Sequence, residues 1–156
     1  QSISYPGTVD EVVAMYLTPD YLERRFGRFV VEGSTTVSVD GERVSYAGTV
    51  RPELIPAAAA RFVKSDLRVT FTEEWTTNEA GASSRTSVAV DGAPVSVEAT
   101  STLTPSEAGS TREVSGNLSV RVPLLGGRIE KEAVARVGRL TDNEQASAAQ
   151  WLEEHR

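Results

Sequence analysis

The stretch that decides the fold is GGRIEKEAVARVGRLTDNEQASAAQWLEE, residues 126–154, which is entered through VPLLGG at 122–127. Its apolar residues recur at helical spacing, which predicts one long amphipathic helix. The stripe on its apolar side contains Leu125, Ile129, Ala133, Val137 and Leu140, and it continues through Glu144, Ser147 and Trp151. At this length the helix would span roughly 40 Å, enough to cross about seven strands spaced about 4.8 Å apart. We therefore expect it to pack against a curved sheet that wraps around it.

Two short helices are predicted near the start of the chain, after one short strand. Residues 2–5 alternate between polar and apolar side chains, as a strand does. Thr8 and Glu11 have the spacing of a capping box for the first helix. The second helix begins after Thr18, its predicted cap, and ends at Gly27.

Six further strands are predicted between these helices and the last one. Asp-Gly pairs at 40–41 and 91–92 are typical of tight hairpins. Prolines and an alanine run in residues 51–66 predict a loop with a short helical turn. The predicted strands are 28–39, 42–50, 67–77, 85–90, 95–103 and 112–122. Short connections favour antiparallel pairing, so we expect an α+β fold, and the length of 156 residues indicates a single domain.

Composition excludes several classes of function. The chain has no cysteine, and its single histidine, His155, lies next to the C-terminus, so we expect neither a metal site nor a cofactor. The formal net charge of −6 is the reverse of what nucleic-acid binding requires. Arg24, Arg25 and Arg28 gather locally, which we interpret as a solvated helix face. No apolar run is long enough to cross a bilayer, and cytoplasmic residence is the default expectation.

Two short motifs resemble a known group of proteins. They are Tyr5-Pro6 followed by LTPDYL at 17–22, and VPLLGGRIEK at 122–131. With the order of the elements, they resemble the START-like superfamily (SRPBCC), which has the helix-grip fold of pollen allergens, lipid-transfer domains and polyketide cyclases. Within it, they look like an uncharacterised actinobacterial family of unknown function. The resemblance implies an apolar ligand between the sheet and the last helix, and it brings no catalytic motif.

That placement selects the candidate ligand-binding residues, which come from the inward faces of strands, from the loop at 51–66 and from the last helix. They are Tyr46, Phe62, Phe71, Glu73, Trp75, Leu118, Val120, Ile129, Ala133, Val137 and Leu140. Gly126-Gly127 is the predicted hinge of the last helix, where flexible backbone would let the helix open the cavity.

Glu73 is the residue most able to carry chemistry. Strict alternation places it on the same face as Phe71 and Trp75. A desolvated carboxylate there would have a raised pKa and would serve as an acid, a base or a ligand anchor. The alternative, which we favour from burial statistics, is that the strand twists or ends and leaves Glu73 near a wet rim. Glu144 on the last helix poses the same question.

Three functions are compatible with this sequence. The first is binding, and possible transport, of a hydrophobic small molecule or lipid in a mainly apolar cavity. The second is an enzyme of the cyclase or hydratase kind that uses Glu73 and Tyr46 as its acid–base pair. The third is a protein-interaction module whose interior is filled by its own side chains. A pocket of about 300 Å³ or more with apolar walls favours the first.

Overall fold

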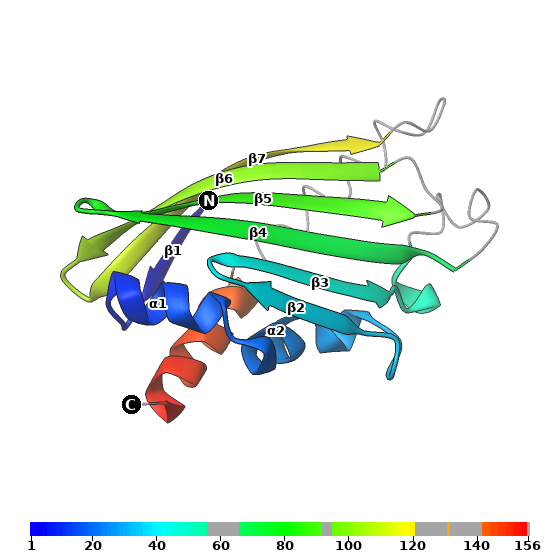
Figure 1. Ribbon diagram of the computed structural model, residues 1–156, viewed down its shortest axis with the longest axis horizontal. Helices are drawn as coiled ribbons and strands as arrows, with labels where there is room; N and C mark the ends of the chain where they lie inside the picture. The colour runs from blue at the N-terminus through cyan, green and yellow to red at the C-terminus, as the bar shows by residue number, and fades with distance from the viewer. Residues whose placement is uncertain (56–65, 92–94, 121–130, 132–141, 156) are drawn as a thin grey trace.

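Seven strands form one antiparallel sheet in the order β1-β7-β6-β5-β4-β3-β2. The computed structural model describes residues 1–55, 66–91, 95–120, 131 and 142–155, without the side chains of Val95 and of residues 118–120. The sheet is curved (Figure 1); each strand from β2 to β6 pairs with the next one along the chain, and β1 pairs with β7 at one edge. The strands are β1 (Ser2–Tyr5), β2 (Thr36–Asp40), β3 (Arg43–Thr49), β4 (Arg68–Asn78), β5 (Gly81–Asp91), β6 (Val95–Ser106) and β7 (Gly109–Val120).

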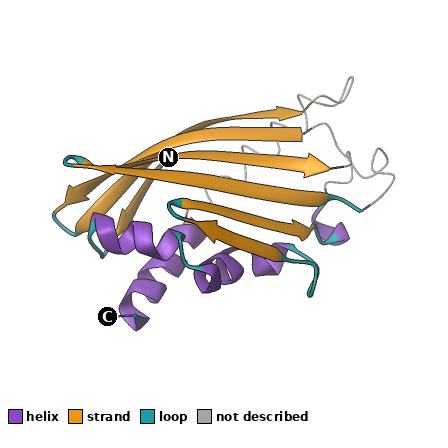
Figure 2. Ribbon diagram, viewed as in Figure 1, coloured by secondary structure: helices purple, strands orange, loops and turns teal. Residues whose placement is uncertain are grey.

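The helices gather on one side of this sheet (Figure 2). They are α1 (Val9–Tyr16), α2 (Pro19–Phe26), two short 3₁₀ turns, η1 (Gly27–Phe29) and η2 (Pro52–Leu54), and a C-terminal helix at residues 142–154. The α+β prediction is confirmed: two short helices follow the first strand, and a helix closes the chain. The first half of the predicted long helix lies outside the described residues, apart from Lys131.

Both predicted helix starts are confirmed in position, but only one of the two predicted caps forms a side-chain hydrogen bond. The backbone N–H of Glu11 donates to the Thr8 hydroxyl at 3.2 Å, and the Thr8 N–H donates to the Glu11 carboxylate at 3.0 Å, which completes the capping box. Thr18 stands at the N-cap of α2 but makes no side-chain cap. Its hydroxyl donates instead to the carbonyl of Ala14 at 2.7 Å. Proline in the first turn leaves α2 with one fewer N–H to satisfy.

The prediction of a strand over residues 28–39 is wrong for residues 28–35. The chain makes the 3₁₀ turn η1, a single bridge between Val30 and Val50, and then a turn in which the Ser34 N–H donates to the Val31 carbonyl at 3.1 Å. Gly33 supplies the positive φ of 81° that this turn requires. Only Thr36–Asp40 pairs as a strand. The propensity of valine and threonine for strands was outweighed by local turn geometry.

The other strands match the predictions except at their ends. β5 begins at Gly81 because β4 and β5 pair down to Asn78 and Gly81 across a tight turn. The side chain of Asn78 accepts from the N–H groups of Ala80 and Gly81, which closes that turn. The Asp40-Gly41 hairpin is confirmed, with Gly41 at φ 60°.

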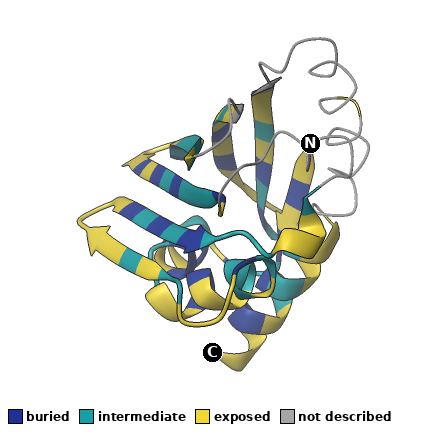
Figure 3. Cartoon of the chain, turned by 90° about the vertical axis from the view of Figure 1, so that its right-hand side faces the viewer, coloured by how far each residue is buried: buried dark blue, intermediate teal, exposed yellow. Residues whose placement is uncertain are grey.

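The core lies between the inner face of the sheet and the helices, and Figure 3 shows buried residues alternating with exposed ones along the strands. One cluster joins β1, α1, β4 and the C-terminal helix. Its largest members are Tyr5, Tyr16, Tyr21, Trp75 and Trp151. A second, smaller cluster joins α2 to β3 and β4 and contains Leu22, Val30, Val44, Tyr46 and Phe71.

Candidate functional site

Polar side chains lie among apolar ones on the inner face of the sheet. Cross-strand pairing places Glu73 of β4 opposite Thr86 of β5, and Ser84 of β5 opposite Ser101 of β6. Side chains alternate between the two faces along a strand, so these four polar side chains lie on the same face as the core residues of their strands. The sheet therefore presents a polar strip to the helices.

Glu73 is at the centre of this strip and is fully enclosed, with 1% of its surface exposed. One carboxylate oxygen accepts from the Trp75 indole N–H at 3.0 Å. The other accepts from the Thr86 hydroxyl at 2.6 Å and from Arg112 at 3.1 Å. The rim position that we favoured from the sequence is wrong, because the strand continues for several residues beyond Glu73.

Arg112 of β7 supplies the positive charge that balances Glu73. Its guanidinium also donates to the hydroxyls of Ser101 at 2.9 Å and Ser84 at 3.1 Å. It lies within 5.0 Å of the ring centre of Tyr16 and 4.8 Å of that of Trp75. The ion pair is thus enclosed by aromatic rings and hydroxyl groups, where electrostatic interactions are stronger than in water.

A second buried ion pair joins α2 to the C-terminal helix. Arg25 Nε lies 3.0 Å from the carboxylate of Glu144. The same carboxylate accepts from the hydroxyl of Tyr16 at 2.8 Å, and Tyr5 and Tyr16 share a hydrogen bond of 2.7 Å. The side chains of Arg25 and Glu144 are 15% and 13% exposed, respectively. Glu144 therefore points inward and does not overhang the edge of the sheet.

These contacts set the protonation states. Burial alone raises the pKa of Glu73, but Arg112, Arg25 and the hydrogen bond from Thr86 outweigh it, so the pKa is lowered. The expectation of a raised pKa is therefore wrong, because desolvation is offset by two cations. Burial lowers the pKa of Arg112, but the nearby carboxylate of Glu73 raises it by more. The net shift of the Arg112 pKa is therefore upward. Both groups are held in their charged forms.

Arg25 differs from Arg112 in one respect. Its Nη1 is buried and has no hydrogen-bond partner among the described residues. The guanidinium lies 5.0 Å from the ring centre of Tyr16, 4.7 Å from that of Phe26 and 5.2 Å from that of Phe71. Within the described part of the chain, this charged donor nitrogen therefore lies among aromatic rings without a hydrogen-bond acceptor.

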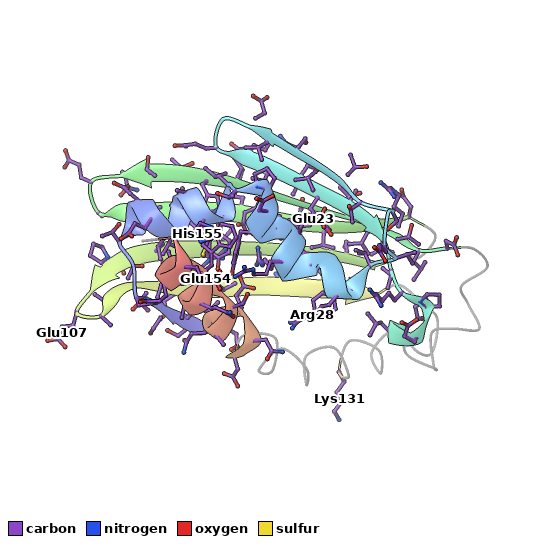
Figure 4. The ribbon with its side chains drawn as sticks, turned by 90° about the horizontal axis from the view of Figure 1, so that it is seen from below. Glu23, Arg28, Glu107, Lys131, Glu154 and His155 are labelled. Carbon is purple, nitrogen blue, oxygen red and sulfur yellow. The ribbon has the colours of Figure 1, made fainter. Side chains whose placement is uncertain are left out.

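A pocket of about 430 Å³ opens over this polar strip. Most of the surface exposed in its described lining is apolar, and the lining residues include both ion pairs and Arg28. Arg28 itself is exposed on η1, next to the end of α2 (Figure 4). The lining comes from the sheet, from α2 and η1 and from the C-terminal helix, and includes Ile3, Phe26, Phe29, Ala99 and Val114.

A smaller pocket of about 210 Å³ adjoins the first one. It shares Phe26 and Phe29 with the larger pocket, and the rest of its described lining is almost wholly apolar. The other lining residues are Val30, Tyr46, Gly48, Val50, Val69, Phe71 and Val88.

Two larger hollows, of about 570 and 680 Å³, lie on the opposite face of the sheet. Their described walls are mostly serine, threonine and charged residues, and they include Glu74, Arg85 and Thr100. An apolar ligand would gain little by leaving water for such walls, so the inner pocket is the better candidate site.

The structure brings some of the predicted site residues together. Glu73 lines the larger pocket, and Tyr46 and Phe71 line the smaller one. Trp75 packs in the core beside them, stacked on Tyr16 at 5.7 Å between ring centres. Leu118 and Val120 belong to β7, with side chains outside the description. The remaining predicted residues, and the predicted hinge, lie outside the described residues: Phe62, Gly126-Gly127, Ile129, Ala133, Val137 and Leu140.

Tyr46 and Glu73, the proposed acid–base pair, have separate partners. The Tyr46 hydroxyl donates to Glu23 of α2 at 3.3 Å. Burial, and then the carboxylate of Glu23, raise the pKa of Tyr46 to about 12. Glu73 is bound by Trp75, Thr86 and Arg112, as described above. No hydrogen bond links the two within the described part of the chain.

Arg25 and Arg112 were missed as site residues, although the sequence contains a signal for each. Arg112 alternates in phase with Val114 on the inner face of its strand. Arg25 follows Tyr21 and Leu22 at helical spacing, which places it on the buried side of α2. The interpretation of the arginine cluster as a solvated face is wrong for Arg25 alone.

No group of histidine, cysteine and acidic residues suited to a metal ion occurs among the described residues. In the same part of the chain, no helix has the length and apolar character needed to span a membrane.

Comparisons with known proteins agree with this fold. The chain is 26% identical to the uncharacterized protein Rv0481c of Mycobacterium tuberculosis strain H37Rv, over 97% of this chain and 94% of that protein. Two solved structures resemble it at low identity. A conserved protein from Geobacillus kaustophilus has a TM-score of 0.58 at 20% identity, over 98% of this chain and 93% of that one. Protein CV1439 from Chromobacterium violaceum has a TM-score of 0.57 at 15% identity, over 96% and 94%.

A family model also matches nearly the whole chain. A family described as protein of unknown function, DUF2505, matches residues 1–152. Its unknown function and the mycobacterial relative fit the prediction of an uncharacterised actinobacterial family. The chain belongs to the DUF2505 family of proteins of unknown function.

Proposed function

We propose that this protein binds a hydrophobic small molecule or a lipid in the pocket between the sheet, α2 and the C-terminal helix. The observation that carries the proposal is the pocket of about 430 Å³, whose described lining exposes mainly apolar surface and also contains the charged side chains of the two ion pairs. That combination is typical of small-molecule sites. A START-like (SRPBCC) relationship belongs to the same proposal, and it is supported by the two motifs and by the order of the elements.

The alternatives have less support. A protein-interaction module with a filled interior would lack a pocket of this volume. A cyclase or hydratase that used Glu73 and Tyr46 would need the two groups to converge on one substrate atom, whereas Tyr46 is engaged with Glu23. Glu73 is also held as a carboxylate by Arg112.

The proposal is tested by filling the pocket. Ala99 lines it from β6, and Ala99→Trp would place an indole ring inside it. We expect N-phenylnaphthylamine, a neutral fluorescent probe, to bind the wild-type protein and to bind Ala99→Trp at least about tenfold more weakly, since lost apolar contacts exceed the ~1.4 kcal/mol of one such step. Fluorescence titration measures both affinities.

The matched control is Thr100→Trp, on the next residue of β6 and the opposite face of the sheet. It adds the same ring and is expected to leave probe affinity unchanged. Urea unfolding verifies that both variants fold, because overpacking costs about 1–3 kcal/mol. A wild-type protein that does not bind the probe, or an Ala99→Trp variant that binds it normally, would contradict the proposal.

A further inference from the structure

We propose that the ligand is an amphipathic carboxylic acid whose carboxylate accepts hydrogen bonds from Arg25 Nη1. This inference rests on the proposed function and adds the chemical class of the ligand. It comes from an unpaired donor, from the balance of charge in the pocket and from the arrangement of the two pockets.

The unpaired donor is Arg25 Nη1. It is the one buried side-chain nitrogen or oxygen without a hydrogen-bond partner in the part of the chain that the structure describes. Leaving a charged donor unpaired in a buried site is costly, so a partner is expected there. Arg25 also lines the larger pocket, so the side chain that carries this donor forms part of the pocket wall. The rings of Phe26 and Phe71 beside the guanidinium strengthen such a contact by excluding water.

The charge balance of the pocket favours an anion. Among the described lining side chains are three arginines, Arg25, Arg28 and Arg112, and two glutamates, Glu73 and Glu144. Three positive and two negative charges leave a balance of +1, although the whole chain carries −6. One excess positive charge matches a monoanion such as a carboxylate better than a dianionic phosphate ester. Arginine is well suited to this role because its planar fork matches carboxylate geometry.

The two pockets indicate a ligand with an apolar body. The smaller pocket adjoins the larger one at Phe26 and Phe29, and the rest of its described lining is almost wholly apolar. A molecule whose carboxylate meets Arg25 can direct its apolar part between these rings toward Val30 and Val88. The larger pocket would then hold the carboxylate of the ligand, and the smaller pocket would hold its apolar part.

The test compares three probes that share one alkyl chain and differ only in the head group. Decanoate is an anion, decanol is neutral and decylamine is a cation. Calorimetric titration of each, below its critical micelle concentration, gives its affinity for the wild-type protein. We expect decanoate to bind at least about tenfold more tightly than decanol, because hydrogen bonds to charged groups contribute more than neutral ones, and decylamine to bind most weakly.

Arg25→Lys tests the residue itself. Lysine keeps the positive charge toward Glu144 but removes the guanidinium donor, so decanoate affinity should fall at least about tenfold while decanol affinity stays unchanged. Arg24→Lys is the matched control, because Arg24 is a neighbour on α2 whose guanidinium pairs with Glu154 at the surface. It should bind both probes as the wild-type protein does.

The outcomes separate the two proposals. If decanol and decylamine bind as tightly as decanoate, or if Arg25→Lys binds decanoate normally, the pocket binds apolar ligands but the carboxylate inference is overturned. If none of the three probes binds, the proposed function fails and this inference fails with it. Should Arg25→Lys not fold, the comparison of the three probes on the wild-type protein decides.

Discussion

Glu73 and Arg112 form an ion pair on the inner face of the sheet, where both side chains are almost fully buried. Removing two charges from water usually costs as much as their attraction returns, so such a pair adds little stability in comparison with well-packed apolar residues. What it does provide is a set of fixed polar atoms. Each carboxylate oxygen of Glu73 has a defined partner, and Arg112 holds two serine hydroxyls in place.

Breaking the pair is expected to destabilise the protein strongly. Glu73→Gln leaves Arg112 charged and enclosed without its counter-ion, which should lower the free energy of unfolding by about 3–5 kcal/mol. Glu74→Gln is the control: Glu74 faces the outside, 3.9 Å from Arg43, and both side chains are about 60% exposed. An exposed pair of this kind contributes less than about 1 kcal/mol. Urea unfolding of both variants measures the difference, and equal losses would contradict this assignment.

The same pair predicts how stability depends on pH. The pKa of Glu73 is lower in the folded protein than in the unfolded chain, where it is about 4.3. The unfolded chain therefore binds more protons on acidification, and stability falls as pH decreases. The contribution of Glu73 is fully present above about pH 4.3 and is lost as pH falls through the folded pKa.

Glu73→Gln should accordingly show a shallower loss of stability between about pH 5 and pH 2 than the wild-type protein. Unfolding midpoints in urea across this range provide the measurement. An identical slope in the two proteins would mean that Glu73 has the same pKa in both states.

At the scale of elements, the hairpin between β6 and β7 depends on one glycine. Gly109 has φ 144°, and a Cβ there would lie 2.4 Å from the carbonyl oxygen of Tyr5 and 2.6 Å from the backbone N of Gly7. Backbone cannot move aside as a flexible side chain can. The turn and the end of β1 therefore fit together only when this position has no side chain.

Gly109→Ala should destabilise the protein by more than about 3 kcal/mol, because strained φ and a backbone collision act together. Gly33→Ala separates the two effects, since Gly33 also has a positive φ, 81°, but a Cβ there has no neighbour within 4 Å. We expect it to cost about 1–2 kcal/mol. Thermal and urea unfolding of the two variants test this order, and a larger cost at Gly33 would refute it.

The elements themselves were largely predictable, and their limits and partners were not. Alternation in β4 placed Glu73 on the same face as Phe71 and Trp75, although we favoured a rim position for it, and the Asp40-Gly41 pair predicted a hairpin that the structure contains. The strand predicted over 28–39 was too long, because turns around Gly33 compete with strand propensity. The charge partner of Glu73 was not predictable, because Arg112 lies 39 residues further along the chain and is brought to Glu73 by the pairing of the strands. Local pattern does not specify such a pairing.

At the scale of the whole molecule, the sheet contributes one ion pair to the site and the helices contribute the other. The sheet supplies Glu73 and Arg112 as a fixed floor, and α2 and the C-terminal helix supply Arg25 and Glu144 as a second layer. Residues from both layers line the larger pocket. A ligand there would touch elements from both ends of the chain, so ligand binding should raise the unfolding temperature of the whole structure and not of one part.

The pairing of β1 with β7 has a consequence for how the chain is made. Ser2 reaches Glu113 across 111 residues of sequence. At synthesis rates of about 5–20 residues per second, the first strand waits about 6–22 s for its partner to be translated. During that interval Ile3 and Tyr5, both buried in the finished protein, have no sheet to cover them. We therefore expect β1 to pair late during synthesis, and the nascent chain to carry Ile3 and Tyr5 uncovered until β7 is made.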